Sequence, residues 1–323
     1  MKKLLSAVFV LLAVLLLGAG RADAAPAGFT PEIHRTFEGT PGELAIRDAN
    51  GFDGGVANAN LQPVYSSDVS WHGTTSAKVA IQKFPHPQAD RKYFSWGGFF
   101  RTKGLVAHGG QYWCRILTYY PAGFSWRFDG TVQKPDGTVI LPGEALKFMR
   151  LGLHKDGSNL GDWGFYQMYG GTDNKGMTVT CGIPAESIQK DFYARYPWQN
   201  STPHHLNDEL GPPIARGRWV NHEVYMKLDG NHNGVHRYYV DGQLVFEETG
   251  VNTSVAGAVV GDIRIFTYWN AGAPQDQHCY VGDFVFSTGT PPNAGSDGNP
   301  IIGDWIPNSR PTTPEGVGVR GVQ

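Results

Sequence analysis

Two basic side chains lie within an apolar segment, where a charge needs either a partner or a ligand. The segment reads Ala145-Leu-Lys-Phe-Met-Arg-Leu-Gly-Leu-His154, and it is apolar enough to be a central strand. Strand alternation puts Lys147, Met149, Leu151 and Leu153 on one face and Leu146, Phe148, Arg150, Gly152 and His154 on the other. Only one face can meet the core, so we expect one charge on a ligand-accessible face or in an internal ion pair.

The sequence patterns of several other chemistries are missing or incomplete. No Glu-x-Asp-x-x-Glu or Glu-x-Asp-x-Glu string supplies the carboxylates, about 5 Å apart, of a retaining jelly-roll glycosidase, and no Gly-x-Ser-x-Gly elbow or phosphate-binding glycine motif occurs. The segment Asp229–Gly234 resembles the start of a calcium-binding loop. Its twelfth position is Val240 instead of Glu, so we interpret the segment as a β-turn.

Three cysteines, Cys114, Cys181 and Cys279, are spread through the chain without a CxxC pair. That spacing gives no zinc-binding pattern. It is compatible with one disulfide and one remaining thiol, and it does not define the pairing.

The elements that would position these side chains are short strands with a period of two. No 12-residue stretch keeps a clean helical period. The predicted strands are Ser76–Gln82, Tyr112–Tyr119, Leu146–Leu153, Trp163–Tyr169, Trp219–Leu228, Val235–Val240, Gln243–Glu247, Asp262–Trp269 and Tyr280–Ser287. Many short strands separated by turns are typical of an all-β sandwich or jelly roll.

Two segments carry additional local predictions. In Trp219–Leu228, alternation predicts a buried set from Val220 to Leu228 and a solvated set that includes Asn221 and Glu223. Asp241-Gly242, between two β-rich runs, predicts a tight hairpin. The region 172–217 is expected to be a long excursion over the sheet, with a short helix near 185–193.

The first residues predict export from the cytoplasm. Lys2 and Lys3 precede an apolar run from Leu4 to Leu17, and Ala22-Asp-Ala24 resembles a cleavage site, so we expect residues 1–24 to be a signal peptide. We expect a jelly-roll domain over 25–288 and a Gly- and Pro-rich, mostly extended tail over 289–323, in a secreted or periplasmic monomer without a membrane contact after cleavage. The remaining 24 basic and 28 acidic side chains do not favour nucleic acid as a partner.

Several strings, in chain order, resemble polysaccharide lyase family 14 and its glucuronan and heparin lyase-like relatives. They are Tyr119–Phe124, Ala145–Gly152, Gly217–Leu228, Val240–Gly242 and Tyr268–Gly272. The resemblance covers about residues 110–287. It implies a concanavalin A-like β-jelly roll, a two-sheet antiparallel sandwich with a substrate groove on its concave sheet.

The resemblance also implies a chemistry, which is β-elimination on a uronic-acid polymer. A cationic or amide group neutralises the C6 carboxylate, a side chain removes the C5 proton, and an acid protonates the departing O4. Lys147 matches the essential lysine of the family, and Tyr166 and Tyr193 are the other expected catalytic residues. Where relatives carry a Ser-x-Arg pair, this chain has Gly164-Phe-Tyr166, so we expect Arg150 or Gln167 to hold the carboxylate.

For several of the remaining candidates, a purely structural role is an alternative to substrate binding. The expected substrate-binding side chains are Arg115, Arg150, His154, Gln167, Tyr196, Tyr268 and Trp269. His154 could equally be a structural histidine, and Tyr268 and Trp269 could stack on sugar rings or belong to the core. No cofactor is expected to be required, although Glu38 and Asp283 are candidate ligands of a structural calcium ion.

The sequence therefore predicts a secreted lyase for an alginate- or glucuronan-like glycan. The alternatives are a lectin-like protein that binds carbohydrate without cleaving it and a surface structural protein that does neither. The polymer partner is common to the first two readings, and formation of an unsaturated product distinguishes them.

Overall fold

The computed structural model describes the chain in segments. They comprise residues 29–45, 52–56, 62–81, 98–102, 106–125, 132–133, 139–140, 146–155, 158–170, 177–181, 214–230, 232–254, 256–269 and 275–305. Within them every regular element is a strand, and none forms a helix long and apolar enough to cross a membrane. The chain divides into two compact units, Thr30–Gly303 and Met1–Phe29 with Asp304–Gln323. The first unit contains both large sheets.

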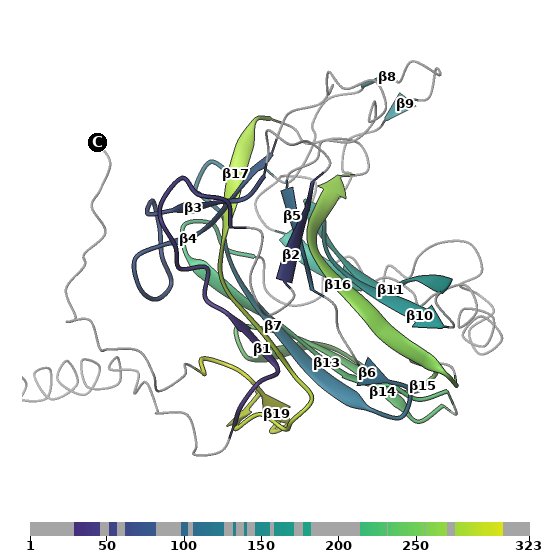
Figure 1. Ribbon diagram of the computed structural model, residues 1–323. Coiled ribbons are helices and arrows are strands. Elements are labelled where there is room, and N and C mark those ends of the chain that lie inside the picture. Colours follow the sequence, from purple (N-terminus) through teal and green to yellow (C-terminus); the bar gives the residue numbers. More distant parts are fainter. Residues whose placement is uncertain are drawn as a thin grey trace, which may run out of the picture. The chain divides into compact units, whose positions relative to one another are not determined.

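One large sheet, which we call sheet A, has the order β15-β14-β13-β7-β17-β4-β3, with β1 also paired to β17 (Figure 1). All of the paired strands are antiparallel. The strands are β1 Ile33–Arg35, β3 Val64–Ser66, β4 Ser76–Ile81, β7 Gln111–Tyr119, β13 Trp219–Lys227, β14 Gly234–Val240, β15 Gln243–Val251 and β17 Gln277–Ser287.

The second large sheet, sheet B, has the order β12-β11-β10-β16-β5-β2, with β6 also paired to β16. Its strands are β2 Phe52–Val56, β5 Gly98–Thr102, β6 Val106–Ala107, β10 Leu146–Lys155, β11 Ser158–Gly170, β12 Met177–Cys181 and β16 Ala258–Trp269. Two further pairs complete the described strands: β8 Val132–Gln133 with β9 Val139–Ile140, and β18 Asn293–Ala294 with β19 Pro300–Ile301.

A single hydrophobic core joins the two sheets. Its buried members include Cys114 and Val224 from sheet A and Met149, Ile263 and Ile265 from sheet B. Two antiparallel sheets that share one core form the sandwich that the sequence predicts, so the all-β jelly-roll prediction is confirmed.

The predicted strands all correspond to observed ones, with ends that differ by a few residues. The Asp241-Gly242 turn joins β14 to β15, and both residues have positive φ, 49° and 74°. This is the backbone of a type I′ hairpin, for which Asp-Gly is suited. The predicted helix near 185–193 lies outside the described residues, and so does the predicted signal peptide.

Cys114 and Cys279 are both free and buried in the core. Burial raises the pKa of each thiol well above its usual value, so both stay protonated. The side chain of Cys181 lies outside the described residues.

Part of the face of sheet A that points away from the core is covered by the chain's own C-terminal segment, residues 289–303. The sequence predicts that Asn221 and Glu223 meet water, but they are only 5% and 1% exposed. Glu223 accepts hydrogen bonds from the backbone N–H groups of Ile302, at 2.5 Å, and Gly303, at 3.0 Å. The prediction that these two residues are solvated was wrong, because a segment of the chain covers them. Local alternation could not reveal that segment, since it lies about 80 residues further along the chain.

A buried ion pair completes this attachment. Arg115, 1% exposed, pairs with Asp283 and donates a hydrogen bond to the carbonyl oxygen of Gly303 at 2.5 Å. His34 Nε2 lies 2.9 Å from the other carboxylate oxygen of Asp283. The backbone at residues 302 and 303 is therefore held by the Glu223 carboxylate through its N–H groups and by the Arg115 guanidinium through the Gly303 carbonyl.

Asp283→Asn should destabilise the protein by about 3–5 kcal/mol, because it leaves the Arg115 guanidinium buried without its counter-charge. Urea unfolding at pH 7 measures the effect. Asp68→Asn is the matched control: its partner Lys78 lies 2.8 Å away in an exposed pair, for which a loss below about 1 kcal/mol is expected. Equal losses in both variants would contradict a special role for the buried pair.

Stability should fall between pH 7 and pH 5, because two core histidines cannot take up a proton without cost. Burial lowers the pKa of His222 and of His236 to about 3 in each case. The unfolded chain binds protons at these positions near pH 6.5 and the folded chain does not, so acidification favours unfolding by about 2 kcal/mol per histidine at pH 5.

The same unfolding experiment at the two pH values tests this. His236→Gln should reduce the difference between pH 7 and pH 5, whatever it does to the stability at pH 7. An unchanged difference in that variant would show that other groups cause the acid sensitivity.

Candidate functional site

Lys147 lies in the middle of sheet B, between two other side chains that the sequence singles out. In the register of the sheet it pairs with Gln167 of β11 and with Tyr268 of β16. Residues directly opposite each other in an antiparallel pair share one face of the sheet. Lys147, Gln167 and Tyr268 therefore occupy one row of positions across three adjacent strands, which are spaced by about 4.8 Å.

The face that carries this row is set by a break in the register of β10. Met149 of β10 and Ile265 of β16 are fully buried in the core and pair with each other, and Met149 also pairs with Tyr166. The partners of Lys147 are one residue further along β11, at Gln167, and three residues further along β16, at Tyr268. Successive residues of a strand alternate between its two faces, so a separation of one or three residues places the partners of Lys147 on the opposite face from the partners of Met149.

In β10 itself, Lys147 and Met149 are two residues apart, and strict alternation would keep them on one face. The register puts them on opposite faces, so the alternation of β10 is interrupted at Phe148, as in a β-bulge. Uninterrupted alternation, as the sequence suggests, would put Lys147 on the face of Met149. The register instead assigns Lys147 to the opposite face, the one that points away from the core. We call this the outer face of sheet B.

A row of arginines crosses the same face about 7 Å further along the strands. Arg150 of β10 pairs with Arg264 of β16, which pairs with Arg101 of β5. The flanking residues Ile263 and Ile265 are fully buried, so alternation puts this row on the outer face together with Lys147. At one end the row continues to Asp53 of β2, which pairs with Arg101.

His154 lies on the outer face as well, near the end of β10. It pairs with Val259 of β16, whose neighbours Ala258 and Val260 belong to the core while Val259 itself is exposed. His154 is half-buried. Its position is compatible with a substrate contact at the edge of the site.

Two predicted site residues fall on the other face. Tyr166 pairs with the buried Met149, and Trp269 pairs with Leu146, one residue from the Lys147 row. Both positions belong to the core side of sheet B. The resemblance implied that Tyr166 acts with Lys147 in catalysis, but the register places the two positions on opposite faces of sheet B.

Other predicted residues lie elsewhere. Arg115, expected to bind substrate, is buried beneath the C-terminal segment in its pair with Asp283, so its surroundings are those of an internal ion pair. Tyr193 and Tyr196 lie outside the described residues.

Glu38 and Asp283, the candidate calcium ligands, both have partners within the protein. Glu38 accepts hydrogen bonds from the backbone and hydroxyl of Thr74, at 3.1 and 3.2 Å, and Asp283 is engaged with Arg115 and His34. Among the residues described above, no group of three or more His, Cys, Asp or Glu side chains is arranged to hold a metal ion. A structural calcium ion at these two residues stays a prediction.

Arg101 and Arg264 are the functional candidates that sequence reasoning missed. Arg264 stands between two isoleucines of a predicted strand, which is the same signal that identified Arg150. Arg101 belongs to Gly98–Thr102, a short strand that alternation did not reveal.

The arrangement suits an extended anionic ligand. Three cationic positions in one row can balance several negative charges, and arginine binds carboxylates in a bidentate geometry. The neighbouring amine, amide and phenol supply groups that can move a proton or hold a carboxylate. The two rows on the outer face of sheet B therefore form the candidate site.

Comparisons with known proteins give likenesses in fold. No protein-family model matches the chain, and no curated protein sequence matches it. Similar solved structures include the endo-β-1,4-glucuronan lyase from the fungus Trichoderma reesei, with 14% identity over 80% of this chain and 96% of that one and a TM-score of 0.49. Another is the marine PL-14 alginate lyase from Aplysia kurodai, with 12% identity over 70% and 87% of the two chains and a TM-score of 0.47. The metal-free carbohydrate recognition domain of Emp46p is also similar, with 9% identity over 74% and 88% and a TM-score of 0.36.

Proposed function

We propose that this protein is a polysaccharide lyase that cleaves a uronic-acid-containing glycan by β-elimination on the outer face of sheet B. The observation that carries the proposal is the register of Arg150, Arg264 and Arg101 in one row, next to the row of Lys147. A neutral glycan offers no reason for three adjacent cations, whereas a polyuronate presents a carboxylate on each sugar unit. We further propose that the protein acts outside the cytoplasm after removal of residues 1–24.

The arginine row addresses the first requirement of β-elimination. A uronate C5 proton is too weakly acidic to be removed while the C6 carboxylate keeps its full charge. Arg150, with the amide of Gln167, would neutralise that carboxylate and stabilise the charge that develops as the proton leaves. This is the role that a Ser-x-Arg pair would have in the family that the sequence resembles.

Lys147 and Tyr268 are the proposed proton-transfer groups. One of them accepts the C5 proton, the electron pair of the C5–H bond forms the C4–C5 double bond, and the C4–O4 bond breaks. The other donates a proton to O4, so that no net charge accumulates. The two residues pair directly across β10 and β16, which suits an acid and a base on neighbouring atoms of one sugar unit.

Lys147→Ala should lower turnover by about 10²–10⁴-fold, the usual contribution of a general acid or base. The rise of ultraviolet absorbance from the unsaturated uronide measures it, on alginate, glucuronan and heparinoid substrates. Lys78→Ala, a surface lysine of sheet A, is the control and should keep full activity. Binding to every polymer without new absorbance, in the unsubstituted protein, would overturn the lyase proposal in favour of a lectin-like function.

Arg150→Gln and Arg264→Gln should each raise KM by roughly 10–100-fold, because each removes a hydrogen bond to a charged group. Steady-state kinetics at two salt concentrations measure the change, and the salt dependence should weaken in both variants. Arg218→Gln removes an exposed arginine that pairs with Asp241 on sheet A and should leave KM unchanged. An unchanged KM in both sheet B variants would exclude the row from substrate binding.

A further inference from the structure

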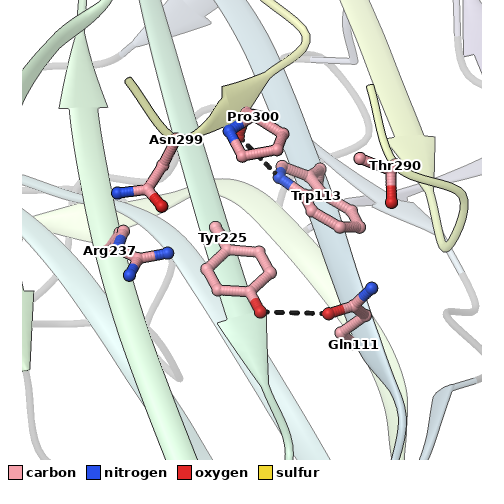
Figure 2. Close-up of a pocket in the computed structure, with 7 residues that line it drawn as sticks. All are labelled: Gln111, Trp113, Tyr225, Arg237, Thr290, Asn299 and Pro300. Atoms are coloured by element: carbon pink, nitrogen blue, oxygen red, sulfur yellow. Dashed lines mark hydrogen bonds between the residues drawn. The ribbon is translucent and has the colours of Figure 1, made fainter. Parts of the chain in front are cut away.

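A small pocket of about 190 Å³ lies on the opposite side of the sandwich, over the outer face of sheet A. Its floor and walls come from three adjacent strands and from the C-terminal segment that covers this face (Figure 2). The lining residues are Gln111, Trp113, Tyr225, Arg237, Thr290, Asn299 and Pro300. None of them belongs to the site on sheet B.

The floor of the pocket is a fixed aromatic pair. The rings of Trp113 and Tyr225 have centroids 4.8 Å apart, with an interplanar angle of 39°. Trp113 Nε1 donates a hydrogen bond to the carbonyl oxygen of Pro300 at 2.9 Å, and Tyr225 donates one to Gln111 Oε1 at 3.0 Å (Figure 2). Partial burial raises the pKa of Tyr225 above its usual value, so the phenol stays protonated and keeps this bond.

The rim offers both hydrogen-bond donors and acceptors. Arg237 lies over the Tyr225 ring, with its guanidinium carbon 5.3 Å from the ring centroid. Gln111 contributes amide N–H groups, Asn299 an amide oxygen, and Thr290 a hydroxyl that can do either. An apolar floor with a few convergent polar groups is the composition of a small-ligand site.

The charges around the pocket disfavour an anion. Arg237 already pairs with Glu247, and Asp297 lies beside the pocket, where it accepts hydrogen bonds from Asn299 at 2.6 Å and from Tyr239 at 3.1 Å. Hydrogen bonds from Asn299 and Tyr239 hold the pKa of Asp297 below its usual value despite partial burial, so it is charged at neutral pH. The carboxylates of Glu247 and Asp297 outnumber the Arg237 guanidinium, so the net charge beside the pocket is negative, whereas the arginine row on sheet B is positive.

We infer that this pocket binds one neutral sugar unit. Sugar hydroxyls both donate and accept hydrogen bonds, as the rim requires, and the C–H face of a pyranose packs against aromatic rings. The volume is below the range of about 300–1,000 Å³ that drug-sized ligands occupy, so the pocket takes one ring and not a chain. The site is separate from the proposed lyase site, and its ligand differs in charge.

Nuclear magnetic resonance titration tests the inference, with D-glucose, D-galactose and D-mannose as probes and D-glucuronate and D-galacturonate as charged counterparts. We expect saturable shifts of the Trp113 indole N–H and of the Gln111 and Asn299 amides with at least one neutral sugar. The corresponding uronate should bind about tenfold more weakly, since it loses the match to the local charge. Equal affinity for the uronate, or no saturable shift with any neutral sugar, would overturn the inference.

Gln111→Ala should weaken binding about tenfold, because it removes a rim donor and the acceptor of the Tyr225 hydroxyl. Thr290→Val gives a second test on an exposed residue with little risk to folding. Gln243→Ala removes an exposed glutamine at the start of β15 and should leave the affinity unchanged. If Gln243→Ala weakens binding as much as Gln111→Ala, or if both pocket variants bind normally, the pocket is not the site.

The outcome is independent of the lyase proposal. Arg150→Gln should keep the neutral-sugar affinity of the pocket while it raises KM for a uronate polymer. Neutral-sugar shifts confined to β10 and β16 would assign that binding to sheet B and would overturn the inference about the pocket.

Discussion

The register break at Phe148 is the constraint on which the candidate site depends. Strict alternation along β10 would separate Lys147 from Arg150, with one of the two charges turned toward the core. Because the alternation of β10 is interrupted between Lys147 and Met149, the lysine and the arginine lie on the same face of sheet B. A bulge is the local means by which a strand can present two functional side chains on one face while its remaining positions still fill the core. Met149 of β10 and Ile265 of β16 remain packed in the core beneath the site.

The C-terminal segment has a comparable effect on the other sheet. Glu223 and Arg115, which pair directly across β13 and β7, bind the backbone at residues 302 and 303, and both are buried there, where an unpaired charge would be costly. This attachment covers part of the outer face of sheet A. It also builds the walls of the small pocket, because Asn299 and Pro300 precede the attached residues directly. The same contacts thus cover part of sheet A and form the walls of the small pocket.

Much of the fold was accessible from the sequence, whereas the arrangement of the site was accessible only in part. Strands such as Trp219–Lys227 have long, regular alternation, so local pattern identifies them. Phe52–Val56 and Gly98–Thr102 are short and contain glycine, which weakens the same signal. Neither the face of Lys147 nor the burial of Glu223 could be predicted, because the first depends on register with β11 and β16 and the second on a segment about 80 residues away.

The two faces of the sandwich therefore differ in charge and in shape, and this difference constrains how one glycan could engage both. The arginine row runs across three strands of sheet B from Arg101 to Arg150 and suits several consecutive charged units. The pocket on sheet A is one ring in size and has a carboxylate excess, so a polyuronate chain that occupied the row would be repelled from it. A glycan that uses both sites must then carry neutral sugars as well as uronates, with a neutral unit that can reach the far side of the sandwich. A mixed polymer, with neutral side branches or blocks, satisfies that requirement, whereas a pure polyuronate would engage sheet B alone.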